Sequence, residues 1–243
     1  MYFTDESIKI HYKKEGLNGP AIILLHGWGQ SLETFDFLIK HLKENYQVFA
    51  LDLPGFGKSD QPTKSLSIDD YVKTLKNFIS HEKITDFILL GHSLGGRIAI
   101  KYSANNRVRK LVLINSAGIR PKRSLGYYFR VYRYKLMKKL GRTNPNAGSA
   151  DYRSATSVMK GTLSLVVKED LKQYADIIKA ETLIIWGSDD QVTPLKDAYT
   201  FLNLIDNSDL AIIPGTGHFC YLENKAYFLM IVNSFLLRGE ERD

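Results

Sequence analysis

Phe87-Ile-Leu-Leu-Gly-His-Ser-Leu-Gly-Gly96 is an apolar run of strand length that ends in a Gly-x-Ser-x-Gly turn. The residues that follow, from Arg97 onward, have the composition of a helix. Ser93 is therefore expected on a sharp strand-to-helix turn, where glycines on both sides remove the Cβ clashes that such a turn creates. This position would expose the hydroxyl of Ser93 and make it a candidate nucleophile.

Five other short segments are apolar throughout, as strands covered on both faces are. They predict a central, mostly parallel sheet: 21–25, 48–51, 111–114, 182–186 and 210–213. Residues 7–14 alternate polar and apolar side chains, which indicates a half-exposed strand near a sheet edge. Segments with helical spacing lie between the strands, at 32–46, 68–79 behind the possible cap Ser67, 97–105, 194–204 and 221–237. The alternation predicts a sheet with helices on both faces.

Residues 118–180 interrupt this alternation, because they contain no buried-strand pattern. Within them an apolar side chain recurs every three or four residues, at Leu125, Phe129, Tyr132, Leu136 and Leu140. That spacing predicts an amphipathic helix. We therefore expect residues 118–180 to be a helical lid inserted into a core formed by residues 1–117 and 181–243.

The positive charge of the chain is local. The formal net charge is +7, yet nine Lys or Arg residues and no Asp or Glu lie between Arg120 and Arg142. The simplest interpretation is the solvated face of the predicted lid helix. The alternative is attraction of an acidic substrate, an acidic carrier protein or an anionic surface. No nucleic-acid-binding motif accompanies the charge, so a nucleic-acid partner is not expected.

Composition also bounds the class of protein. The chain has 243 residues, 44% of them hydrophobic, which suits one sizeable α/β core. A single cysteine, Cys220, excludes an internal disulfide and is expected to be a small buried apolar residue. The first residues lack an export signal, and no segment is apolar for the length of a membrane span. We expect a soluble, cytoplasmic protein without a membrane span.

A serine nucleophile needs a base and an orienting acid elsewhere in the chain. His218 is the strongest candidate base, since it follows the apolar run 210–213 and a Pro-Gly-Thr-Gly turn. His11, His41 and His81 lie in polar or helical surroundings and are expected at the surface. His92, inside the serine turn, is expected to pack.

The chain resembles the α/β-hydrolase family in five motifs that occur in the family's order. They are His26-Gly-Trp-Gly29, Asp52-Leu-Pro-Gly-Phe-Gly-Lys-Ser59, Gly91-His-Ser-Leu-Gly-Gly96, Trp186-Gly-Ser-Asp-Asp-Gln-Val-Thr-Pro194 and Gly217-His-Phe219. The resemblance implies the α/β-hydrolase fold with Ser93 as nucleophile and His218 as base. In the family pattern the acid stands three residues after the glycine and four before the proline. Those counts favour Asp190, with the adjacent Asp189 as the alternative.

The resemblance also implies an oxyanion hole made by the backbone N–H groups of Trp28 and Leu94. His26 would brace the oxyanion loop, and Asp52 would be structural. Trp28 is also expected to line the substrate pocket, together with four aromatic residues of the predicted lid, Tyr127, Tyr128, Phe129 and Tyr132. Neither a cofactor nor a metal ion is expected, because His26, Asp52, Asp190 and His218 lack metal-site spacing.

These residues predict a serine hydrolase that cleaves small carboxylic esters through an acyl-enzyme. Three alternatives stay open, because one fold serves several reactions. One is an esterase for acyl groups on an acidic carrier protein, docked by Arg130, Arg133, Lys138, Lys139 and Arg142. Another is a carbon–carbon bond hydrolase or lyase of the same fold. The last is a ligand-binding protein with a slow triad.

Overall fold

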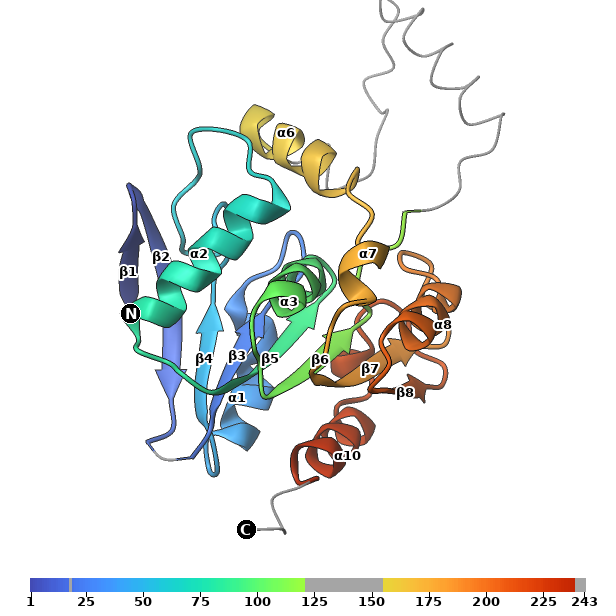
Figure 1. Cartoon of the computed structure of the whole chain (residues 1–243). Coiled ribbons are helices and arrows are strands. Elements are labelled where there is room, and N and C mark those ends of the chain that lie inside the picture. Colours follow the sequence, from blue (N-terminus) through green and yellow to red (C-terminus); the bar gives the residue numbers. More distant parts are fainter. Residues whose placement is uncertain (18, 121–154, 239–243) are drawn as a thin grey trace, which may run out of the picture.

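The computed structural model of the protein describes residues 1–17, 19–120 and 155–238. All six apolar runs of the sequence form strands (Figure 1). The eight strands are β1 Tyr2–Asp5, β2 Ile8–Glu15, β3 Ala21–Leu25, β4 Gln47–Leu51, β5 Phe87–His92, β6 Lys110–Ile114, β7 Glu181–Gly187 and β8 Ser208–Ile213. They make one sheet in the order β1-β2-β4-β3-β5-β6-β7-β8.

The sheet is mostly parallel, as predicted. The strands from β4 to β8 in the sheet order all run parallel. At one edge β2 pairs antiparallel with β4, and β1 pairs antiparallel with β2. Strand β1 was not predicted, since its four residues Tyr2–Asp5 are too few to establish an alternating pattern.

One prediction about burial is wrong. Residues 210–213 were expected to be covered on both faces, but β8 is the last strand of the sheet. Four of its six residues are half-buried, one is exposed and only Ile213 is buried. An edge strand has a neighbour on one side only, and this explains why its apolar side chains stay partly open to solvent.

The helices between the strands occupy the predicted segments with altered ends, and two further helices within 155–180 were not among those segments. They are the short 3-10 helix η1 Leu32–Phe35, α1 Asp36–Leu42, α2 Ile68–His81, α3 Leu94–Asn105, α6 Ser157–Val166, α7 Lys172–Ala175, α8 Leu195–Leu204, α9 Cys220–Glu223 and α10 Lys225–Leu236. The segments 32–46 and 221–237 each divide in two, the second of them at Asn224. Ser67 caps α2 as expected, with Asp70 completing a capping box.

Helices cover both faces of the sheet (Figure 1). On one face the side chains of α2, α3 and α8 pack against β3, β5 and β7, with Phe78, Ile98 and Phe201 fully buried. On the other face α1 and α10 pack against the alternate residues of the same strands, with Leu38 and Phe228 fully buried. This division follows from the pleat, which sends successive side chains of a strand to opposite faces.

The strand register places the polar motifs together at the carboxyl ends of the parallel strands. Leu25 of β3 lies beside Gly91 of β5, His92 beside Ile114 of β6, and Gly187 of β7 beside Ile213 of β8. These are the carboxyl ends of parallel strands, where open α/β folds bind their ligands. The loops that follow these strands carry every predicted catalytic residue.

Residues 155–180 return the chain to the sheet through α6 and α7. The N–H of Leu171 donates to the carbonyl of Gly118 at 2.9 Å, and this bond joins the start of the segment 118–180 to the loop before α7. Arg97 of α3 donates to the carbonyl of Glu169 at 3.0 Å, and Lys101 pairs with the Glu169 carboxylate at 2.5 Å. The predicted lid helix over 125–140 lies outside the described residues. In the part of the chain that is described, no helix has the length and apolar character needed to cross a bilayer.

Candidate active site

Ser93 occupies the turn between β5 and α3 with a left-handed backbone, φ 51° and ψ −106°. A residue other than glycine is strained in this region, so the surrounding structure must hold it there. The N–H of Ser93 donates to the Ile114 carbonyl at 3.1 Å, and its carbonyl accepts from Arg97 and Ala117 at 3.2 Å each. The glycine at 95 is required by space, since a Cβ there would lie 2.0 Å from the Leu25 carbonyl oxygen.

Ser93, His218 and Asp190 form one connected hydrogen-bonded chain. Nε2 of His218 lies 3.0 Å from Oγ of Ser93, and Nδ1 of His218 lies 2.8 Å from Oδ2 of Asp190. Nδ1 donates to the carboxylate, which leaves Nε2 free to accept the serine proton. The structure thus brings together the three residues predicted as a triad.

Asp190 is buried while its neighbour Asp189 is exposed, so the two carboxylates have different surroundings. Oδ1 of Asp190 accepts from the N–H groups of Val192 at 2.7 Å and Thr193 at 3.0 Å. Burial by itself raises the pKa of Asp190, but hydrogen bonds from His218 and Thr193 and the charge of protonated His218 outweigh it. The pKa of Asp190 is therefore well below its ordinary value.

Two further residues hold Asp190, and the sequence did not identify either of them as part of the site. Nδ2 of Asn115 donates to Oδ2 at 2.6 Å, and the hydroxyl of Thr193 lies 2.6 Å from the same oxygen. Asn115 directly follows the carboxyl end of β6, and this position is the signal that could have identified it as a site residue. Thr193 stands three residues after Asp190, a spacing at which a side chain can cap a turn.

The predicted oxyanion groups lie beside the serine. Leu94 is the first residue of α3, where a backbone N–H has no carbonyl acceptor within the helix. The loop of Trp28 is tied to the serine turn, since the Gly95 N–H donates to the His26 carbonyl at 3.1 Å. A Cβ built on Gly27 would lie 3.2 Å from Cβ of Ser93. The loop that carries Trp28 therefore lies against the turn that carries Ser93 and Leu94.

His26 and Asp52 support the loops around the site. Nδ1 of His26 donates to the Gly27 carbonyl at 2.7 Å, and Nε2 accepts from the Leu53 N–H at 3.0 Å. Burial is the main reason that the pKa of His26 is lowered to about 4. Oδ1 of Asp52 accepts from the Leu32 N–H at 2.8 Å, and Oδ2 accepts from the Lys58 N–H at the same distance. Both side chains hold the backbone of neighbouring loops through hydrogen bonds.

The expectation for His11 is wrong, because its side chain is buried and not at the surface. Nδ1 of His11 lies 2.7 Å from Oδ2 of Asp52. The two residues come from β2 and the loop after β4, strands that neighbour each other in the sheet. A buried carboxylate needs such a partner, and the polar sequence around His11 gave no sign of it.

The predicted pocket residues are only partly described. Trp28 is half-buried and packs edge-on against Phe56, with ring centres 4.9 Å apart. Met159 of α6 touches Gly55 in the neighbouring loop, where a Cβ would lie 2.6 Å from its sulfur. Tyr127, Tyr128, Phe129 and Tyr132 lie outside the described residues, as do the basic residues considered for docking. Within the described ranges, no group of three or more His, Cys, Asp or Glu residues could hold a metal ion.

Comparison with known proteins finds hydrolases among the similar chains. The chain is 29% identical over 270 residues to a 2-hydroxy-6-oxononadienedioate/2-hydroxy-6-oxononatrienedioate hydrolase of Escherichia coli O81 (strain ED1a), with 96% of this chain and 93% of the relative covered. It is similar to the solved structure of an esterase from Exiguobacterium antarcticum, with a TM-score of 0.76, 26% identity and coverage of 95% and 96%. The chain is also similar to the crystal structure of a membrane phospholipase A, described as a bacterial virulence factor, with a TM-score of 0.81 and 24% identity. The match covers 97% of this chain and 84% of that chain, and it supports the fold alone.

The family model for the alpha/beta hydrolase fold matches residues 20–134 and 127–225. The match spans most of the chain and includes each strand of the parallel part of the sheet. The similar proteins include a hydrolase of 2-hydroxy-6-oxononadienedioate or 2-hydroxy-6-oxononatrienedioate and an esterase. The chain therefore belongs to the α/β-hydrolase fold family.

Proposed function

We propose that the protein is a serine hydrolase that cleaves carboxylic esters through an acyl-enzyme. The observation that carries the proposal is the connected arrangement of Ser93, His218 and Asp190, with heavy-atom distances of 3.0 Å and 2.8 Å. Both distances are within hydrogen-bond reach, which is what proton transfer from a serine to a histidine requires.

In the first half of the reaction, Oγ of Ser93 attacks the ester carbonyl carbon while Nε2 of His218 takes the hydroxyl proton. The carbonyl oxygen becomes an oxyanion, which accepts hydrogen bonds from the N–H groups of Trp28 and Leu94. The tetrahedral intermediate then collapses, and the bond to the alcohol oxygen breaks. His218 gives its proton to the departing alcohol, and the acyl group stays on Ser93.

In the second half, His218 removes a proton from water, and the resulting nucleophile attacks the acyl-enzyme. Collapse of this second intermediate releases the carboxylic acid and returns the proton to Ser93. Asp190 keeps the tautomer of His218 in which Nδ1 carries hydrogen, and its negative charge stabilises the imidazolium of each intermediate. No group beyond these residues and water is needed to balance the two steps.

An uncharged acyl or alcohol group suits the described surroundings of the loop that carries Trp28. Phe56 packs on the indole ring, and Met159 lies against the loop beside it. Apolar walls of this kind favour an apolar ligand. The mechanism in itself sets no requirement for charge on the substrate.

Carbon–carbon bond hydrolysis is the second candidate, favoured by the 29% identity to the Escherichia coli hydrolase named above. The two candidates separate in one experiment with purified protein, p-nitrophenyl esters of increasing acyl length and a 2-hydroxy-6-oxo-dienoate. We expect turnover of the short esters at least about a hundredfold more efficient than turnover of the dienoate, which corresponds to about 3 kcal/mol in transition-state binding. The reverse ranking would replace ester hydrolysis by carbon–carbon bond cleavage.

The basic segment between Arg120 and Arg142 leaves a more specific prediction. If it docks an acidic carrier protein, turnover of a carrier-bound ester falls steeply with salt, whereas turnover of a small neutral ester does not. Equal salt dependence for the two substrates would support the interpretation of the segment as a solvated face.

A further inference from the structure

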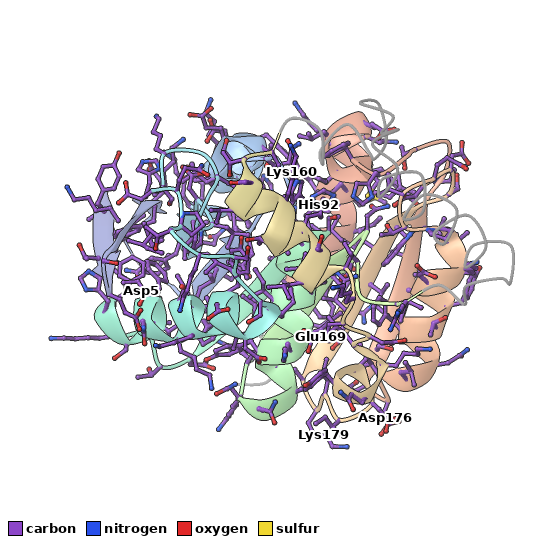
Figure 2. All side chains as sticks on the ribbon, turned by 90° about the horizontal axis from the view of Figure 1, so that it is seen from above. Asp5, His92, Lys160, Glu169, Asp176 and Lys179 are labelled. Carbon is purple, nitrogen blue, oxygen red and sulfur yellow. The ribbon has the colours of Figure 1, made fainter. Side chains whose placement is uncertain are left out.

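His92 stands immediately before the nucleophile, at the end of β5. Its side chain is 1% exposed, so the expectation that it packs is confirmed. Figure 2 labels it near the centre of the view from above. The ring lies among the aromatic side chains of the base loop, with centroid distances of 4.9 Å to His218, 5.3 Å to Phe219 and 4.9 Å to Tyr221.

Packing is not the only contact that His92 makes. Its Nε2 lies 2.9 Å from the backbone carbonyl oxygen of His218, across 126 residues of sequence. A carbonyl oxygen only accepts hydrogen bonds, so Nε2 must carry the hydrogen and donate it. The residue beside the nucleophile thus holds the main chain of the base.

The other ring nitrogen of His92 faces the oxyanion loop. Nδ1 is buried and has no hydrogen-bond partner within the described residues. A Cβ built on Gly27 would lie 2.7 Å from this nitrogen, so the ring fills the space between Gly27 and the His218 carbonyl. The ring is neutral, because burial first and the nearby charge of His218 second lower the pKa of His92 to about 3.

The peptide groups on either side of His218 are held as well. The N–H of Gly217 donates to Oε2 of Glu223 at 2.8 Å, and the N–H of Phe219 donates to Oε1 at 3.2 Å. Glu223 therefore fixes the two flanking N–H groups, while His92 fixes the carbonyl of His218 itself. With its main chain held at these points, the imidazole of His218 keeps little freedom beyond its own side-chain torsions.

We propose that His92 is a positioning residue that sets the main-chain position of His218 relative to Ser93 and the oxyanion loop. The inference rests on the proposed function, in which His218 is the base. The hydrogen bond of His92 goes to the backbone carbonyl of His218, so His92 acts through the main chain of the base. Its donor matters because a displacement of the base by about 1 Å can cost a hundredfold in rate.

Two substitutions separate the donor from the packing. In His92→Gln the side-chain amide can place an N–H near the position of Nε2 but the ring is lost, whereas His92→Phe keeps a ring and loses the donor. With p-nitrophenyl acetate we expect kcat of the Phe variant to fall about ten- to hundredfold with KM within about twofold, and kcat of the Gln variant to stay within about threefold of the wild type. His92→Leu repeats the loss of the donor if the phenyl ring destabilises the fold, which thermal unfolding would reveal.

A packing role predicts the opposite order, with the Phe variant active and the Gln variant impaired, and that order would overturn the proposal. Unchanged kcat in all three variants would overturn it too. Proton NMR gives a readout that needs no substrate, since the Nδ1 proton shared by His218 and Asp190 is expected at low field. It should persist in the wild type and His92→Gln and be lost or shifted in His92→Phe. If the proton signals behave in this way but the wild type cleaves no ester, the positioning role of His92 is supported and the proposal of ester hydrolysis is wrong.

Discussion

Nδ2 of Asn115 donates a hydrogen bond of 2.6 Å to Oδ2 of Asp190, the oxygen that also accepts from His218. Asn115 stands after β6 and Asp190 after β7, so the bond joins the ends of two neighbouring strands. The acid of the proposed triad is therefore held from outside its own loop. This arrangement ties the orientation of His218 to the geometry of the sheet.

Exchange of each adjacent carboxylate in turn tests the assignment of the acid. Asp190→Asn removes the negative charge beside His218 and can place an amide donor against Nδ1, which disfavours the tautomer with hydrogen on Nδ1. We therefore expect kcat for ester hydrolysis to fall by about 10³ to 10⁴. Asp189→Asn alters an exposed side chain that does not contact His218, and kcat should change by less than about twofold. Steady-state kinetics of the two variants show which of the two carboxylates is the acid. Equal losses, or the larger loss at position 189, would contradict the assignment to Asp190.

Loss of the Asn115 amide should weaken catalysis without abolishing it. Asn115→Ala removes one donor from Oδ2 of Asp190, and we expect kcat to fall about tenfold because the carboxylate keeps its other donors. Ser116→Ala is the matched control, since its hydroxyl donates to the Ala117 carbonyl at 3.0 Å and not to Asp190. A control that loses as much activity as Asn115→Ala would show that the effect is general to this loop.

Stability should depend on pH through Asp190. Its pKa in the folded state is below the ordinary value of 3.8, so the ionised carboxylate stabilises the folded protein above that pH. As the pH falls below 3.8, the unfolded state takes up the proton before the folded state does, so this stabilisation is lost progressively until the pH has fallen through the folded-state pKa. Denaturant unfolding of the wild type and Asp190→Asn at a series of pH values measures the effect. The free energy of unfolding of the wild type minus that of Asp190→Asn should be constant above about pH 5. Below about pH 5 this difference should fall, because the wild type loses the contribution of the ionised carboxylate. A difference that stays constant into the acid range would contradict the lowered pKa.

The space around the serine turn predicts a large cost for one methyl group. Gly95→Ala would place Cβ 2.0 Å from the Leu25 carbonyl oxygen, a backbone atom that has little room to move. We expect a loss of at least about 3 kcal/mol in the free energy of unfolding. Gly215→Ala is the control, since Gly215 has φ +66° and no other atom within 4 Å of its Cβ position. Strain without a clash should cost only about 1 kcal/mol there. Similar unfolding midpoints for the two variants would argue against a tightly packed turn.

The sequence predicted those features of the structure that depend on residues close together in the chain. Each apolar run forms a strand, Ser67 caps α2, and Ser93 lies on the predicted turn between a strand and a helix. The family motifs carried the prediction of the triad, because their spacing encodes which loop follows which strand. Local patterns thus predicted most of the fold, and the resemblance to the family predicted the three residues Ser93, Asp190 and His218.

Contacts between distant segments were missed. Asn115 and Asp190 are 75 residues apart, and His92 and His218 are 126 apart, so no local period connects them. His11 was misjudged for the same reason, since its partner Asp52 lies on a neighbouring strand's loop. The edge position of β8 likewise depends on the order of strands, which apolar runs do not encode. Side-chain hydrogen bonds and sheet order are properties of the assembled fold.

Covalent labelling would show whether Ser93 is the nucleophile. The wild type, Ser93→Ala and His218→Gln would each be treated with a fluorophosphonate and digested, and the modified peptide would be identified by mass spectrometry. We predict one adduct, on Ser93, which is absent in Ser93→Ala and forms far more slowly in His218→Gln because the base that activates the hydroxyl is lost. An adduct on another residue, or ester hydrolysis that persists unchanged in Ser93→Ala, would contradict the account.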